Sequence, residues 1–106
     1  MARKKAKTKT YYHATEYENL YKCMRDGIKA GPDGLVYMCE KEEECVRFLF
    51  IRGVSHVVTF RIEVEEPDKV IETFDHNFDF FQCRCFGFLG DIPASWIEPS
   101  STYDFS

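Results

Sequence analysis

The five cysteines and three histidines of this chain are the residues best suited to metal or nucleophilic chemistry. Cys83 and Cys85 stand two residues apart, so a strand would present both thiols on one face. With a further cysteine or histidine they could ligate zinc, but structural zinc sites normally use two C-x₂₋₄-C pairs, and this chain has one shorter pair. We therefore predict no metal site and interpret the cysteines as small apolar core residues.

Two other arrangements of these residues suggest catalysis. Cys39 precedes a predicted helix whose N-terminus could lower a thiol pKa, but four nearby glutamates oppose that effect. Asp75 and His76 could form an acid–base couple. Adjacent residues rarely direct their side chains at one another, so a turn is the simpler interpretation. His76 stays a candidate because it could reach a ligand cleft from a neighbouring strand.

The pattern of apolar residues predicts alternating strands and helices followed by a strand-rich half. Thr15 and Glu18 have the spacing of a capping box at the start of the first helix. The predicted elements are a strand at 11–15, a helix at 16–26, a strand at 35–39, a helix at 40–52, strands at 57–64, 70–74 and 82–89, and a returning segment at 94–97. This order favours an α+β domain with a curved or split, mostly antiparallel sheet and two early helices.

Length and charge divide the chain into a tail, one domain and a short end. A chain of 106 residues can bury one core and form one shallow cleft. Residues 1–10 carry five basic side chains and no acidic one, which predicts a solvated, disordered tail. Residues 11–98 are predicted to form the domain and 99–106 a loose C-terminal end. Since residues 11–106 hold all 18 acidic but only 9 basic side chains, the body is a poor general binder of nucleic acid.

The sequence also bears on location. No stretch approaches the roughly 20 apolar residues that a membrane-spanning helix needs, and the N-terminus lacks the apolar region of a signal peptide. The odd number of cysteines argues against a disulfide framework. We therefore expect a cytoplasmic protein with no membrane partner.

Several short motifs, taken in order, resemble the ADP-ribosyltransferase superfamily. A strand ends in His-Ala-Thr at 13–15, a helix ends in Asp-Gly-Ile at 26–28, and a strand at 36–39 follows a glycine-rich loop. Gly-Asp-Ile-Pro at 90–93 then closes on Trp-Ile at 96–97. The order and spacing are most similar to those of the compact RNA 2′-phosphotransferases and the DNA-targeting ADP-ribosyltransferase toxins. The resemblance implies the small, split-sheet fold of that superfamily over residues 11–98.

The resemblance further implies a site for NAD or a related nucleotide, a small-molecule partner, on the first two strands. In the family, a histidine on the first strand hydrogen-bonds a ribose hydroxyl of the ligand, and His13 matches that position. A neutral imidazole has one donor and one acceptor nitrogen, which suits a hydroxyl. Thr15 would divide its hydroxyl between the helix cap and the ligand. Tyr37 matches an aromatic residue that stacks on a flat ring of the ligand. The alternatives are a structural strand histidine at 13 and a core tyrosine at 37.

The late strand departs from the family pattern. Transferring members carry a glutamate there that stabilises positive charge on the ribose, whereas residues 81–86 contain no carboxylate. We predict Gln82 and His76 as ligand contacts in this part of the chain, and Arg84 as a catalytic residue. In an ADP-ribosyl or phosphoryl transfer, His13 and Arg84 would take the proton and charge roles, since arginine grips phosphate through paired hydrogen bonds. The other arginines available for phosphate are Arg47, Arg52 and Arg61.

Two classes of function therefore stay open. One is an ADP-ribosyl- or 2′-phosphotransferase that lacks the usual glutamate. The other is a non-catalytic binder, either a sponge or sensor for a nucleotide or a protein-interaction module, and the missing carboxylate favours it. By analogy of fold alone, a compact domain of this kind would suit a toxin or a viral counter-defence protein.

Overall fold

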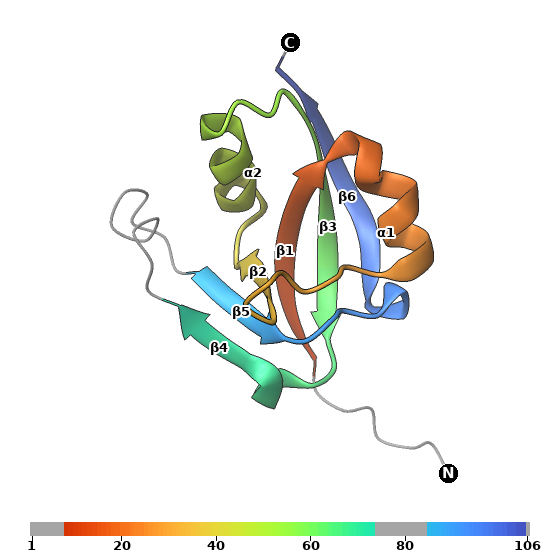
Figure 1. Ribbon diagram of the computed structural model, residues 1–106, viewed down its shortest axis with the longest axis vertical. Helices are drawn as coiled ribbons and strands as arrows, with labels where there is room; N and C mark the ends of the chain where they lie inside the picture. The colour runs from red at the N-terminus through yellow and green to blue at the C-terminus, as the bar shows by residue number, and fades with distance from the viewer. Residues whose placement is uncertain (1–7, 74–84, 106) are drawn as a thin grey trace.

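The described part of the chain folds into one antiparallel sheet with two α-helices, which confirms the predicted α+β class (Figure 1). The computed structural model describes residues 8–73 and 85–105. The strands are β1 (Lys9–Glu16), β2 (Leu35–Cys39), β3 (His56–Val64), β4 (Val70–Thr73), β5 (Cys85–Leu89) and β6 (Ile97–Asp104). The α-helices are α1 (Leu20–Asp26) and α2 (Glu42–Ile51), with single 3₁₀ turns η1 (Tyr17–Asn19), η2 (Pro67–Lys69) and η3 (Ala94–Trp96).

Both ends of the predicted domain extend further than the sequence indicated. Lys9 and Thr10, assigned to the tail, begin β1 because they continue its ladder with β3. The prediction of a loose end at 99–106 is wrong for most of that segment, since residues 97–104 form β6. This strand pairs with β3 from Ile62↔Ile97 to His56↔Asp104. The partner strand therefore orders a segment whose own composition favours a turn.

The predicted capping box is also wrong. Neither Glu16, which precedes η1, nor Asn19, which precedes α1, makes a side-chain cap hydrogen bond. Thr15 lies within β1, opposite Val58 of β3, so its backbone belongs to the sheet and not to a helix start. The helix consequently begins later than predicted, at Leu20.

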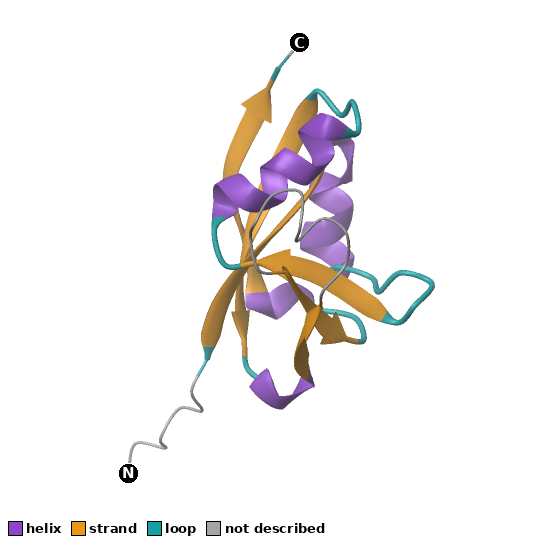
Figure 2. Cartoon of the chain, turned by 90° about the vertical axis from the view of Figure 1, so that its left-hand side faces the viewer, coloured by secondary structure: helices purple, strands orange, loops and turns teal. Residues whose placement is uncertain are grey.

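The sheet is divided between β1 and β2. The strand order is β4-β5-β2-β1-β3-β6. β1 pairs with β3 along its full length, but it pairs with β2 only at Tyr12↔Cys39. Beyond Tyr12 the two strands separate, and Figure 2 shows the strands of the two halves running in clearly different directions. The edge of β1 from His13 to Glu16 is therefore left without a strand partner on the β2 side among the described residues.

The core lies on both faces of this sheet, because successive strand residues point to opposite sides. The larger cluster includes Tyr11, Met38 and Phe86, with Cys23 of α1 and Trp96 of η3 packed against it. The smaller cluster contains their chain neighbours Cys39 and Cys85, together with Cys45 and Phe48 of α2. The alternation places α1 and α2 on opposite faces, and it brings cysteine side chains to the α2 side of the β1–β2 separation.

No helix in the described ranges, 8–73 and 85–105, is long and apolar enough to cross a membrane.

The turn after α1 yields a test of the fold through two glycines. Gly27 has φ 81° and ψ −172°, a conformation that is essentially confined to glycine. A Cβ there would lie 2.2 Å from the carbonyl oxygen of Ile92, which accepts the backbone N–H of Ile28. Gly34 has φ +82° but nothing within 4 Å of an added Cβ. Gly34→Ala should therefore cost only about 1–2 kcal/mol of backbone strain.

We expect Gly27→Ala to lower the free energy of unfolding by about 2 kcal/mol more than Gly34→Ala, because it adds a backbone clash to the strain of a positive φ, which both positions have. Urea denaturation of the two variants beside the parent measures this difference. Equal losses in both variants would contradict the packing described at Gly27.

Candidate functional site

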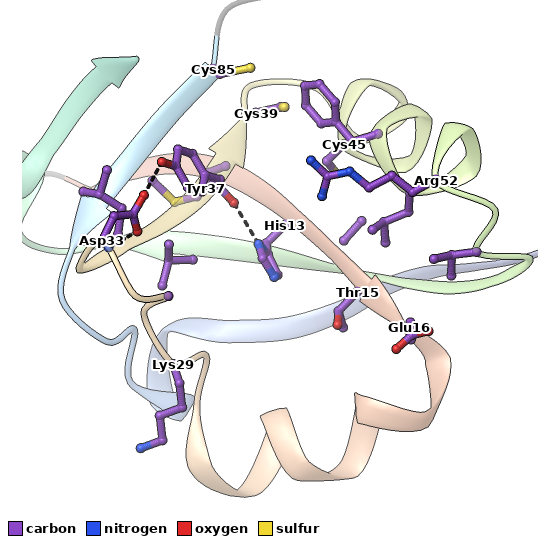
Figure 3. A pocket seen from close by; sticks show the side chains of 18 of the residues that line it. His13, Thr15, Glu16, Lys29, Asp33, Tyr37, Cys39, Cys45, Arg52 and Cys85 are labelled. Atoms are coloured by element: carbon purple, nitrogen blue, oxygen red, sulfur yellow. Dashed lines mark hydrogen bonds between the residues drawn. The ribbon is translucent and has the colours of Figure 1, made fainter. Parts of the chain in front are cut away.

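A pocket of about 860 Å³ lies where β1 and β2 separate (Figure 3). Its described walls come from residues 13–16 of β1, the loop and strand spanning 29–39, α2 with Arg52 and Val54 that follow it, and Cys85 of β5. Because the pocket occupies the missing part of the β1–β2 ladder, strand-borne side chains line it from both halves of the sheet.

His13 lies in the wall of this pocket and spans the separation. Its Nδ1 lies 2.8 Å from the carbonyl oxygen of Tyr37. A carbonyl can only accept, so Nδ1 carries the hydrogen and Nε2 is left as an acceptor. Desolvation lowers the pKa of His13, and the bond to the Tyr37 carbonyl opposes that change less strongly. The imidazole is therefore neutral near pH 7, with one acceptor nitrogen not used in the bond to β2.

Tyr37 presents its ring at the rim of the same pocket. The side chain is 45% exposed, and its hydroxyl donates to the carboxylate of Asp33. The backbone N–H of Leu35 donates to that carboxylate at 3.2 Å. These bonds, led by the one from Tyr37, lower the pKa of Asp33. Asp33 thus fixes the orientation of an exposed aromatic face.

Thr15 contributes a hydroxyl to the pocket wall. Its Oγ1 accepts a hydrogen bond of 2.9 Å from the side-chain amide of Asn19. This bond uses a lone pair and leaves the hydroxyl hydrogen as a donor. Thr15 therefore has donor capacity to offer a ligand, although not by sharing a helix cap as the sequence suggested.

Among the described residues, two cationic side chains line the pocket, and they differ in their partners. Lys29 lies 3.7 Å from the carboxylate of Asp91. Arg52 follows α2, and its guanidinium extends toward the middle of the pocket (Figure 3). Among the described residues no carboxylate lies within 4.0 Å of it. Arg52 is therefore the cation best placed to receive an anionic group.

The other arginines differ from Arg52. Arg61 is paired with Glu63 and Glu98 outside the pocket. Arg47 is exposed on α2 and does not line the pocket. Arg84, predicted as a catalytic residue, lies outside the described residues, as do the predicted ligand contacts Gln82 and His76. The structure thus brings together His13, Thr15 and Tyr37 of the predicted site.

The sequence analysis did not predict Asp33 or Arg52 as site residues. Asp33 could have been suspected from its place in a Gly-Pro-Asp-Gly turn four residues before Tyr37, where aspartate often bonds the following backbone. Arg52 was noted as available for phosphate, but nothing local in the sequence reveals that the end of α2 faces β1.

The thiols on the pocket wall are not arranged for metal binding. Within residues 8–73 and 85–105 no group of three or more Cys, His, Asp or Glu side chains could hold a metal ion. Burial, reinforced by the charge of Glu42, raises the pKa of Cys45 to about 12. Cys45 is therefore a thiol at neutral pH and a poor nucleophile.

Comparison with known proteins finds no significant match to this chain. No protein-family model matches the chain, and neither a curated protein nor a solved structure matches it significantly. Any functional inference therefore rests on the residues of the pocket themselves.

The lowered pKa of His13 predicts a pH dependence of stability. Between the folded-state pKa and the ordinary value near 6.5, the unfolded state binds more protons than the folded state. Stability should therefore fall as pH drops from about 7 through this interval, by at most about 1.4 kcal/mol for each pH unit. His13→Asn keeps a donor for the Tyr37 carbonyl but does not titrate, so its free energy of unfolding should fall less.

Urea denaturation at several pH values between 7.5 and 5 gives the free energy of unfolding of the parent and the variant. Subtracting one from the other removes the contribution of titration at other sites. An NMR titration of the imidazole supplies the direct value. Parallel stability curves, or a His13 pKa at or above 6.5, would show that the ring is not desolvated as described.

Proposed function

We propose that this chain is a small ADP-ribosyltransferase-like domain whose pocket binds an NAD-derived or phosphate-bearing nucleotide. The observation that carries the proposal is the meeting of three unlike groups in one pocket. These are an acceptor nitrogen on His13, an exposed aromatic face on Tyr37, and the guanidinium of Arg52. A nucleotide presents a matching set of groups: ribose hydroxyls that donate, a flat ring and a phosphate.

Each contact follows from ordinary bonding rules. A ribose hydroxyl would donate to Nε2 of His13, since Nδ1 is occupied by the Tyr37 carbonyl. A nicotinamide or other planar ring would lie against Tyr37, which Asp33 holds in place. A phosphate would accept paired hydrogen bonds from Arg52. The pocket volume of about 860 Å³ falls within the range usual for ligands of this size.

The same groups favour phosphoryl chemistry over transfer of an ADP-ribosyl group. Loss of nicotinamide leaves positive charge on the ribose, and residues 81–86 offer no carboxylate to stabilise it. In the described pocket the carboxylates are Glu16 and Asp33, and Asp33 is engaged by Tyr37. Phosphoryl transfer instead needs cationic stabilisation and a base. Arg52 and neutral His13 have those properties.

The second candidate is a non-catalytic sponge or sensor that uses the same contacts. The absence of a carboxylate in residues 81–86 favours it. Turnover separates the two candidates. After incubation and denaturation, a sponge returns the nucleotide intact, whereas an enzyme leaves nicotinamide or a dephosphorylated product.

Binding can be tested with a thermal-shift screen followed by calorimetry, using NAD, ADP-ribose and 2′-phosphorylated ribose compounds. A ligand present at about 100 times its dissociation constant adds about 2.7 kcal/mol of stability, which moves the melting temperature by several degrees. Arg52→Ala should weaken binding of the best compound by roughly 10- to 100-fold, because a hydrogen bond to a charged group contributes about 1.5–3 kcal/mol. His13→Ala should weaken it by about tenfold.

Arg47→Ala is the matched control, since it removes the same charge from α2, five residues before Arg52 but outside the pocket. It should bind like the parent. If no compound shifts the melting temperature, or if Arg47→Ala and Arg52→Ala weaken binding equally, the pocket is not the nucleotide site. The search would then turn to a protein partner.

A further inference from the structure

Two cysteines face each other across the β2–β5 ladder at the pocket wall. Cys39 is the last residue of β2, Cys85 is the first of β5, and the two are Cα partners in the register. Directly opposed residues in antiparallel strands have Cα atoms about 4.5–5.5 Å apart. A disulfide accommodates about 4.4–6.8 Å. Neither cysteine forms a disulfide in this structure, and at this separation a bond between them would require little backbone movement.

The same two thiols lie on one face of the sheet. Cys39 and Cys85 pack in a single cluster with Cys45, and both line the pocket. Figure 3 shows their sulfur atoms on the side of the strands that faces α2. Their exposed fractions are only 2% and 3%. The pocket is therefore the route by which a small oxidant would approach them.

The third thiol of the cluster is engaged differently. Cys45 lies in the first turns of α2, and its Sγ donates to the carbonyl oxygen of Glu42 at 3.1 Å. Burial and the adjacent acidic side chain hold it in the thiol form. Strand register thus pairs Cys39 with Cys85, and the helix retains Cys45 as a neighbour of that pair.

We propose that Cys39 and Cys85 form a reversible oxidation site, and that the disulfide between them weakens nucleotide binding in the adjoining pocket. The first half of this inference stands on the register and the burial of the two residues. The second half rests on the proposed function.

The chemistry balances with a peroxide as the oxidant. One thiolate attacks a peroxide oxygen, which breaks the O–O bond, gives a sulfenic acid and releases water after protonation. The second thiol attacks that sulfur, the S–S bond forms, and a second water leaves with the remaining proton. Two thiols and one hydrogen peroxide thereby yield one disulfide and two waters. A dithiol reductant reverses the change by thiol–disulfide exchange.

The effect on the pocket follows from the position of Cys39. This residue supplies the single pairing of β2 with β1, at Tyr12. A disulfide would draw its sulfur toward β5, on the side of β2 opposite β1. Tyr37, two residues earlier on the strand, holds His13 through its carbonyl oxygen. Even the small movement of Cys39 that the bond requires therefore acts on the two contacts that set the position of His13 relative to Tyr37.

Peptide mapping tests the disulfide directly, because the sequence separates the cysteines cleanly. Trypsin cleavage after Lys41 divides Cys39 from Cys45, and cleavage after Arg84 divides Cys83 from Cys85. The full-length protein is treated with hydrogen peroxide, blocked with iodoacetamide and digested without reductant. We expect the peptide of residues 30–41 linked to that of residues 85–106, and the link should vanish after dithiothreitol.

Matched variants sharpen this measurement. Cys39→Ala and Cys85→Ala should each abolish the linked peptide, whereas Cys45→Ala and Cys83→Ala should retain it. Oxidation of the parent should also raise its melting temperature by several degrees, because the bond closes a long loop in the unfolded chain. Thermal unfolding of every reduced variant verifies that each one is folded. A link to Cys45 or Cys83, or reactive thiols at 39 and 85 after oxidation, would overturn the disulfide assignment.

The binding half is tested on the oxidised parent with the nucleotide that gives the largest thermal shift in the reduced form. We expect a loss of affinity of about tenfold, equivalent to the loss of about one hydrogen bond. Cys85→Ala, which cannot form the disulfide, should bind the nucleotide with the same affinity before and after peroxide treatment. Equal affinity of the oxidised and reduced parent would overturn the regulatory half alone. If no nucleotide binds the reduced protein, the proposed function fails and the regulatory half fails with it, while peptide mapping still decides the disulfide.

Discussion

The hydrogen bond from His13 Nδ1 to the carbonyl of Tyr37 is the contact on which the site depends. Beyond Tyr12↔Cys39 the sheet has no β1–β2 ladder, so this side-chain bond bridges strands that the backbone leaves apart. The same bond fixes the tautomer of His13 and leaves Nε2 as an acceptor. The bond that joins β1 to β2 at this point therefore also determines that His13 can accept a hydrogen bond from a ligand group, such as a hydroxyl. The structural role of His13 is compatible with the proposed one, because Nδ1 makes the bond to β2 and Nε2 keeps its acceptor lone pair.

Electrostatics add a second constraint on the pocket. The body of the protein is acidic, and Arg61 and Lys29 are paired with carboxylates. A net negative body slows the approach of an anionic ligand at low salt. Among the described residues, affinity for a phosphate would accordingly come mainly from short-range contact with Arg52 and not from a general positive field. Such a surface discriminates against long nucleic acids more strongly than against a single nucleotide.

The sequence predicted those strands and helices whose own segment shows a regular pattern of apolar residues. β3 was placed within one residue because its apolar residues alternate over a buried face. β6 was missed because a run of Pro, Ser and Thr has no such alternation, and the strand exists through its pairing with β3. The same division holds for the site. His13 and Tyr37 lie on strands that the motif order placed together, whereas the position of Arg52 depends on how α2 packs across the sheet.

The strand order has a consequence for how the protein acquires its structure. The half formed by β1, β3 and β6 takes residues from 9–16, 56–64 and 97–104, and the half formed by β2, β4 and β5 takes residues from 35–39, 70–73 and 85–89. The two halves are interleaved along the chain, so neither is a continuous segment that could fold first. Most pairings close loops of tens of residues before any contact offsets the lost entropy. During synthesis the full sheet can therefore be completed only after β6, which ends at Asp104, has left the ribosome.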